Sequence, residues 1–168
     1  MNRSGHILIV TGPMGVGKST FCAERVAAAR SAGWEVAGVL SPGRWADGAK
    51  IGIDVVDLRG GEVRRLAHGH GALGGESAQG AAIVTQHWAF DAGAMAWAND
   101  LLAASTPCDL LVVDELGPLE WEQGQGWRAG LTAVDTRAFV TALVVVRPSL
   151  VELALARWPD AESLTLPQ

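Results

Sequence analysis

An eight-residue segment near the start of the chain has the glycine, lysine and serine spacing of a phosphate-binding loop. It reads Gly-Pro-Met-Gly-Val-Gly-Lys-Ser over residues 12–19 and matches G-x-x-x-x-G-K-[S/T], the P-loop or Walker A pattern. Glycines let the backbone wrap closely around phosphate oxygens, so several N–H groups point at the anion. Lys18 is expected to reach the β- and γ-phosphates, and the Ser19 hydroxyl to bind Mg²⁺. The residues expected to surround the phosphates are Gly12, Pro13, Met14, Gly15, Val16, Gly17, Lys18, Ser19 and Thr20.

Two neighbouring carboxylates form the second candidate site. Asp114 and Glu115 directly follow the apolar run at residues 110–113, which predicts a buried parallel strand with acids at its carboxyl end. Ligands of open α/β sheets bind at that edge. Asp114 is therefore expected to bind the Mg²⁺ that bridges the phosphates, the Walker B role. Glu115 is expected to point to the other side of the strand end and to polarise a water molecule aimed at the γ-phosphate.

The elements around these residues alternate between strand and helix. A buried strand over Ile7–Val10 precedes the phosphate-binding loop, a helix from Thr20 to about Ala32 follows it, and Gly60-Gly61 indicates a β-hairpin. The pattern predicts one domain over residues 1–168, an α/β fold with a mostly parallel sheet flanked by helices and a hairpin insertion. The other expected strands are 35–40, 51–58, 62–67, 82–90, 139–146 and 163–166, and the other expected helices are 91–104, 121–133 and 149–158.

Composition limits the classes of partner. The 168 residues are 49% hydrophobic and 18% charged, which is typical of a packed globular chain. A net charge of −5 gives no electrostatic footprint for nucleic acid, and no apolar run is long enough to span a membrane. Cys22 and Cys108 are far apart in core-like segments, which indicates reduced thiols and a cytoplasmic protein.

Four further residues have both a functional and a structural interpretation. Arg44 lies in a loop near the expected active edge, where it could stabilise charge on a transferring phosphoryl group or simply be solvated. Arg147 ends the strand at 139–146 on the same edge and could touch phosphate. Glu120 could orient the acidic loop or begin a helix. Trp45 is the one tryptophan considered for stacking on a base.

Two segments resemble a known family, the small P-loop nucleoside-triphosphatases. Residues 114–120, Asp-Glu-Leu-Gly-Pro-Leu-Glu, resemble that family's D-E-I-G-x-M-E signature, and residues 43–54 are similar to its stretch R-x-x-G-x-R-x-G-F. The resemblance extends from Ile7 to about Leu166. It implies a RecA-like fold, Mg²⁺ dependence and slow hydrolysis of ATP and other nucleoside triphosphates to diphosphates and phosphate. The site residues that it carries over are Lys18, Ser19, Asp114 and Glu115, together with Arg44 and Glu120.

The chain departs from the family pattern at three places. Lys50 stands where the family prefers arginine, and Ile53 where it prefers phenylalanine. The C-terminal residues 164–168 lack the usual closing Asn-Arg. These differences predict a divergent bacterial branch with a specialised role, and they leave the residues that hold the base unassigned.

Three functions fit the residues. The first is a Mg²⁺-dependent nucleoside-triphosphatase. The second is a small kinase that passes the γ-phosphate to a nucleotide or metabolite, because a carboxylate such as Glu115 can also serve a hydroxyl acceptor. The third is a nucleotide-dependent switch that acts on a partner protein through the hairpin. Guanine-specific recognition is not supported because no N-K-x-D motif occurs, and the glycine spacing disfavours a dinucleotide site.

Overall fold

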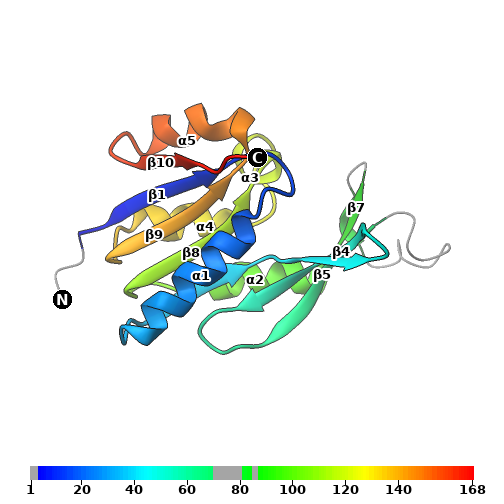
Figure 1. The fold of residues 1–168 in the computed structure, drawn as a ribbon, viewed down its shortest axis with the longest axis horizontal. Coiled ribbons are helices and arrows are strands. Elements are labelled where there is room, and N and C mark those ends of the chain that lie inside the picture. Colours follow the sequence, from blue (N-terminus) through cyan, green and yellow to red (C-terminus); the bar gives the residue numbers. More distant parts are fainter. Residues whose placement is uncertain (1–3, 70–80, 85–86) are drawn as a thin grey trace.

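The strands of the protein form a single twisted sheet, seen face-on in Figure 1. The computed structural model describes residues 4–69, 81–84 and 87–168. Within them the sheet has ten strands in the order β10-β1-β9-β8-β2-β4-β5-β7-β6, with β3 paired to β4. The α/β fold expected from the sequence is confirmed. The strands are β1 (His6–Thr11), β2 (Val36–Leu40), β3 (Gly43–Ala46), β4 (Ala49–Asp57), β5 (Val63–Gly69), β6 (Ala81–Val84), β7 (Trp88–Asp91), β8 (Leu110–Leu116), β9 (Thr141–Val146) and β10 (Glu162–Thr165).

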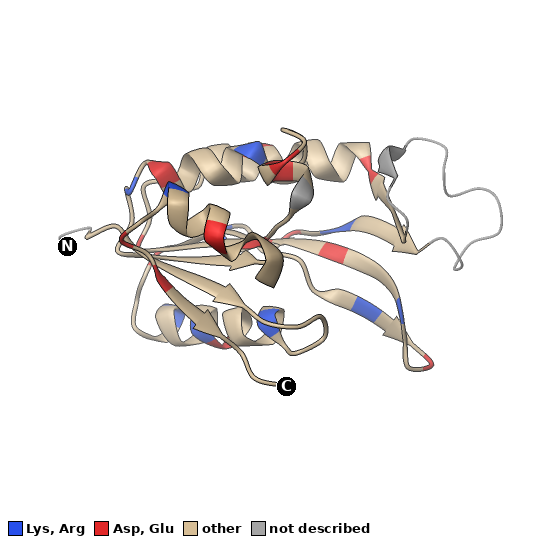
Figure 2. Ribbon diagram, turned by 90° about the horizontal axis from the view of Figure 1, so that it is seen from above, with Lys and Arg blue, Asp and Glu red and all other residues tan. Residues whose placement is uncertain are grey.

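Five of these strands, from β10 to β2 in the sheet order, run parallel to one another. The apolar runs of β1, β2, β8 and β9 are buried because helices cover both faces, as Figure 2 shows with the sheet edge-on. Helix α1 (Lys18–Ser31) packs on one face through Cys22 and Val26. The other face is covered by α2 (Ala92–Ala103), α4 (Arg128–Asp135) and α5 (Val151–Arg157). The carboxyl ends of β1, β9, β8 and β2 therefore meet at one edge.

The expected hairpin is present, and it is part of a larger antiparallel extension. β4 and β5 pair antiparallel, β3 adds to β4, and β7 and β6 continue the sheet beyond β5. The single strand expected over 82–90 is wrong, since β6 and β7 are two strands paired antiparallel. The many Gly, Ala and Ser residues at 68–80 predict a loop. Residues 68–69 instead belong to β5, and residues 70–80 lie outside the described residues.

Two expected helix boundaries also differ. The helix expected over 121–133 is wrong: a short helix α3 (Pro118–Trp121) ends early and α4 begins at Arg128. Gly124 and Gly126 between them have φ of 62° and 71°, a left-handed conformation that interrupts a helix. Ser149 lies inside a 3₁₀ turn and makes no capping hydrogen bond. Asp91 does cap α2 as expected, accepting a 2.7 Å hydrogen bond from the Ala94 N–H.

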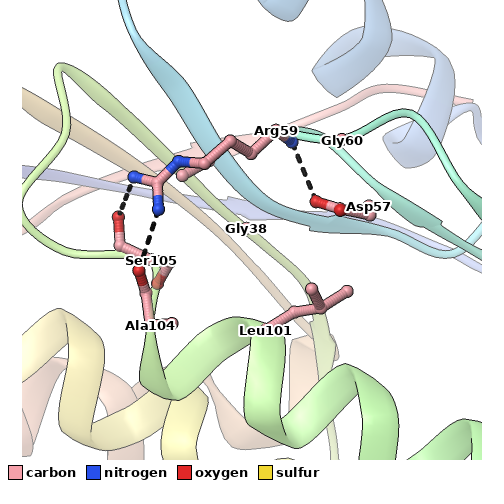
Figure 3. A pocket seen from close by; sticks show the side chains of 8 residues that line it. Gly38, Asp57, Arg59, Gly60, Leu101, Ala104 and Ser105 are labelled. Atoms are coloured by element: carbon pink, nitrogen blue, oxygen red, sulfur yellow. Dashed lines mark hydrogen bonds between the residues drawn. The ribbon is translucent and has the colours of Figure 1, made fainter.

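Arg59, in the β4–β5 turn, ties the antiparallel extension to the parallel part of the sheet. Its guanidinium donates to the Ala104 carbonyl at 2.9 Å and to the Ser105 carbonyl at 3.1 Å, just past α2 (Figure 3). It also pairs with Glu35, before β2, at 2.9 Å. These contacts border a cavity of about 290 Å³ between β2, the β4–β5 turn and the end of α2, away from the edge where the P-loop begins. Because Arg59 satisfies carbonyls at a helix end, its role here is structural.

Arg59→Ala should lower the free energy of unfolding by about 1–3 kcal/mol, because the carbonyls after α2 lose charged hydrogen-bond donors. Glu35→Gln is the matched control. It removes only an ion pair between half-exposed side chains and should cost less than about 1 kcal/mol. Urea denaturation of both variants measures the difference. Equal losses would show that the ion pair, and not the carbonyl contacts, holds the turn.

Candidate active site

The P-loop connects the carboxyl end of β1 to the first turn of α1. Gly12, Gly15 and Gly17 have φ of 146°, 77° and 99°, so the loop uses backbone conformations that glycine adopts easily. Lys18 Nζ donates to the Gly12 carbonyl at 2.8 Å and to the Pro13 carbonyl at 3.0 Å. The ammonium group therefore lies over the loop itself, where it can exchange carbonyl oxygens for phosphate oxygens.

Asp114 is the buried carboxylate of the site. Its side chain is 2% exposed, and its Oδ2 atom accepts hydrogen bonds from Ser19 Oγ at 2.7 Å and from the Ser41 N–H at 2.8 Å. Burial raises the pKa of Asp114 to about 6, although these two hydrogen bonds favour the charged form. The structure thus brings together Ser19 and Asp114, the two residues for which the sequence predicts a role at Mg²⁺.

Ser41 is the member of this cluster that the sequence did not indicate. In the sequence it begins the Ser-Pro-Gly segment that follows the strand expected over 35–40. Its backbone N–H and its Oγ atom, 3.4 Å from the Asp114 carbonyl, both donate to Asp114 because β2 lies next to β8 in the sheet. The available signal was a polar residue at the carboxyl end of a second buried strand.

The Ser19–Asp114 pair has the chemistry of a magnesium site. A hydroxyl and a carboxylate are hard oxygen ligands, and Mg²⁺ in nucleotide sites is usually held by one or two protein oxygens, phosphates and water. No group of three or more His, Cys, Asp or Glu side chains suited to a metal occurs within the described residues. The two residues therefore fit an ion that takes its remaining ligands from a phosphate-bearing substrate.

Glu115 points away from Asp114, as expected from the strand geometry. Asp114 contacts residues from α1 and β2, whereas Glu115 Oε1 lies 3.5 Å from Nε of Arg147, which follows β9. Glu115 has a φ of 71°, a left-handed backbone conformation that is uncommon for a residue with a side chain. Its carboxylate is 41% exposed at the edge of the sheet, so it is accessible to a water molecule.

Arg44 and Trp45 lie on β3, in the antiparallel extension. Arg44 Nη1 is 3.4 Å from Asp54 Oδ2, and Asp54 also pairs with Arg65 at 2.9 Å. In the part of the chain that the structure describes, no hydrogen bond or ion pair joins Arg44 to the P-loop or to Asp114. Trp45 is 61% exposed. Of the two arginines considered from the sequence, it is Arg147 that the structure brings to the acidic strand.

Glu120 organises the loop after β8. Its Oε2 atom accepts from the Gly117 N–H at 3.0 Å, and its Oε1 atom accepts from the Trp127 N–H at 2.9 Å. The side chain is buried, and this burial raises its pKa, with the nearby charge of Glu115 adding to the effect. Of its two expected roles, the hydrogen bonds favour orientation of the acidic loop.

Comparison with known proteins agrees with this geometry. The family model described as NTPase matches residues 7–152. The chain belongs to this NTPase family. It is therefore a nucleoside-triphosphatase, an enzyme that hydrolyses nucleoside triphosphates.

Two relatives of this chain carry the name nucleoside-triphosphatase THEP1. The protein of Methanopyrus kandleri is 30% identical over 92% of this chain and 83% of its own length. The protein of Caldivirga maquilingensis is 29% identical over 82% of this chain and 74% of its own length.

Two solved structures share the fold. A human cancer-related nucleoside triphosphatase superposes with a TM-score of 0.69 and 25% identity, covering 97% of this chain and 89% of that one. THEP1 of Aquifex aeolicus superposes with a TM-score of 0.61 at 15% identity, covering 95% and 89%, and supports the fold alone. No helix in the described part of this chain is long and apolar enough to cross a membrane.

The buried Glu120 predicts a pH dependence of stability. Its folded pKa lies above the ordinary 4.5, so the folded protein binds more protons than the unfolded chain between the two values. The contribution of Glu120 is therefore most favourable below pH 4.5 and is lost as the pH rises through the folded pKa. Urea denaturation of wild type and Glu120→Gln across this range should show wild type losing stability relative to the variant. Parallel curves would contradict the prediction.

Proposed function

We propose that this nucleoside-triphosphatase requires Mg²⁺, uses ATP among its substrates and carries out hydrolysis at the P-loop edge of the sheet. One observation carries the proposal. The Ser19 hydroxyl is hydrogen-bonded to the buried Asp114 carboxylate, while the adjacent Glu115 points to the other side of the strand end, toward Arg147. In this arrangement residues 12–20 cradle the phosphates through backbone N–H groups. Lys18 binds the β- and γ-phosphates, and Ser19 and Asp114 hold Mg²⁺.

The protein's own groups then act on water and phosphate. Glu115 orients a water molecule and accepts its proton as the water oxygen bonds to the γ-phosphorus. The bond from that phosphorus to the β–γ bridging oxygen breaks, and the diphosphate leaves with the bridging oxygen. Glu115 then releases the proton to solvent or to the phosphate product. Bound Mg²⁺ supplies neutralisation of the charge on the phosphate oxygens.

Arg44 as a phosphoryl-stabilising residue has no supporting contact within the described residues. A cytoplasmic location is supported by Cys22 and Cys108, which are buried thiols. The kinase alternative is disfavoured because the relatives are named as triphosphatases.

The switch alternative is favoured by one chain of contacts. Ser41 donates to Asp114, and the carbonyl of the next residue, Pro42, accepts a 3.0 Å hydrogen bond from the Asp54 N–H on β4. A change at Asp114 on nucleotide binding would thus reach the antiparallel extension through two residues. A partner protein bound to that extension would be expected to change the hydrolysis rate.

Lys18→Ala should abolish turnover and weaken triphosphate binding while the fold survives, because the loop loses its only full positive charge. Phosphate release measured with the four ribonucleoside triphosphates, each with and without Mg²⁺, tests the proposal and ranks the bases. Hydrolysis of ATP by Lys18→Ala at the wild-type rate would mean that the P-loop is not the site.

Paired substitutions separate metal binding from water activation. Glu115→Gln should retain nucleotide and Mg²⁺ binding while kcat falls by about 10²–10⁴, the usual scale for loss of a general base. Asp114→Asn should instead raise the Mg²⁺ concentration needed for half-maximal activity. A Mg²⁺ titration of kcat and nucleotide affinity for both variants is the measurement. Full hydrolysis by Glu115→Gln would place water activation elsewhere.

A further inference from the structure

Arg147 occupies the position between the two halves of the proposed site. It directly follows β9, which lies between β1, the strand that leads into the P-loop, and β8, the strand that carries Asp114 and Glu115. All three strands are parallel, so their carboxyl ends share one edge. The preceding residue, Val146, is in register with Leu116, just past the acidic pair.

The ion pair between Arg147 and Glu115 is weak, so a ligand can replace Glu115 as the partner of the guanidinium. Nε of Arg147 lies 3.5 Å from Oε1 of Glu115, and the side chains are 51% and 41% exposed. Half-exposed ion pairs contribute little to stability because water competes for both charges. In the described part of the chain this ion pair is the only hydrogen bond or salt bridge of the Arg147 side chain, so its terminal nitrogens remain available to a ligand.

Other arginines of the described residues make contacts elsewhere. Arg59 binds carbonyls at the opposite edge, Arg44 and Arg65 share Asp54 in the antiparallel extension, and Arg64 pairs with Glu62. A triphosphate seated on the P-loop would bring its γ-phosphate to the carboxyl edge, next to β9 and β8. This phosphate carries more negative charge than one carboxylate and offers a guanidinium two oxygens at once.

We propose that Arg147 is a catalytic arginine supplied by the chain itself. When a nucleoside triphosphate is bound, the Arg147 guanidinium moves away from Glu115 and binds the γ-phosphate. In the structure the guanidinium lies beside the Glu115 carboxylate. With substrate, the guanidinium neutralises charge on the γ-phosphoryl group, and Glu115 is released to orient the attacking water. This inference rests on the proposed function and adds a residue that binds the γ-phosphate, which a nucleoside diphosphate lacks.

The first test compares turnover. Arg147→Ala should lower kcat by about 10³-fold, the lower end for an arginine that stabilises a transferring phosphoryl group. Arg147→Lys keeps the charge but not the two-nitrogen geometry and should recover part of that loss. Arg64→Ala is the matched control, because it removes a similarly exposed arginine with one carboxylate partner, and it should keep wild-type turnover.

The second test distinguishes contact with the γ-phosphate from mere positioning of Glu115. In a Glu115→Gln background, which keeps ATP intact during measurement, ATP and ADP affinities are determined by calorimetry with and without Arg147→Ala. Loss of a charged contact to the γ-phosphate should weaken ATP binding by about 10-fold to 100-fold and leave ADP binding within about threefold. Arg147→Lys in the same background should give an intermediate ATP affinity.

Two results would overturn the inference. One is wild-type turnover by Arg147→Ala while Lys18→Ala and Glu115→Gln remain inactive, which would leave the proposed function standing without Arg147. The other is an equal effect on ATP and ADP, or none on either, in the Glu115→Gln background. If Lys18→Ala and Glu115→Gln also hydrolyse ATP normally, the proposed function itself fails. A thermal melt of each variant checks that it is folded.

Discussion

The burial of the Asp114 carboxylate is the constraint on which the rest of the site depends. A carboxylate removed from water needs hydrogen-bond donors, and Asp114 finds them in the Ser19 hydroxyl and the Ser41 N–H. These donors come from the start of α1 and the end of β2. One oxygen atom therefore fixes the P-loop helix, the acidic strand and the neighbouring strand relative to one another. The raised pKa shows that these donors do not fully compensate for burial. A divalent cation beside this carboxylate would supply the missing charge stabilisation, since an adjacent positive charge favours the ionised form.

The two carboxylates at the end of β8, Asp114 and Glu115, point to opposite sides, and the backbone changes conformation at the second of them. Glu115 is in the left-handed region, a conformation that costs on the order of 1 kcal/mol or more for a residue with a side chain. The neighbouring loop stabilises this turn, since Glu120 binds the Gly117 N–H and reaches Trp127 at the start of α4. Buried support of this kind keeps Asp114 and Glu115 on opposite sides of the strand end. Under the proposed function, Asp114 can then bind Mg²⁺ while Glu115 orients water, and the two carboxylates contact different groups.

The parts that the sequence predicted are those whose geometry is local. The P-loop is a strand, a glycine turn and a helix in succession, and the run at 110–113 places Asp114 and Glu115 without reference to distant residues. Ser41 could not be found this way, because its contact depends on β2 lying beside β8, a pairing between segments about 70 residues apart. The prediction of a continuous helix over 121–133 was wrong because apolar periodicity takes no account of Gly124 and Gly126. Their left-handed backbone conformations turn the chain so that the Trp127 N–H can donate to Glu120. Arg44 and Arg147 were both candidates for contact with phosphate, and the sequence favoured Arg44 through the family resemblance. The sheet order instead brings Arg147 to the acidic strand.

That order also explains why an arginine after β9 has a place in the site. With β9 between β1 and β8, the P-loop and the acidic strand are not adjacent at the sheet edge. Ser19 lies in the first turn of α1, and its hydroxyl reaches Asp114 on the face of the sheet that α1 covers. At the edge itself the end of β9 lies between the end of β1, which leads into the P-loop, and the end of β8, which carries Glu115. The residue that follows Val146 at this position is a half-exposed arginine, with Nε 3.5 Å from Oε1 of Glu115. If β1 lay beside β8, the residue after β9 would no longer lie between the P-loop and Glu115.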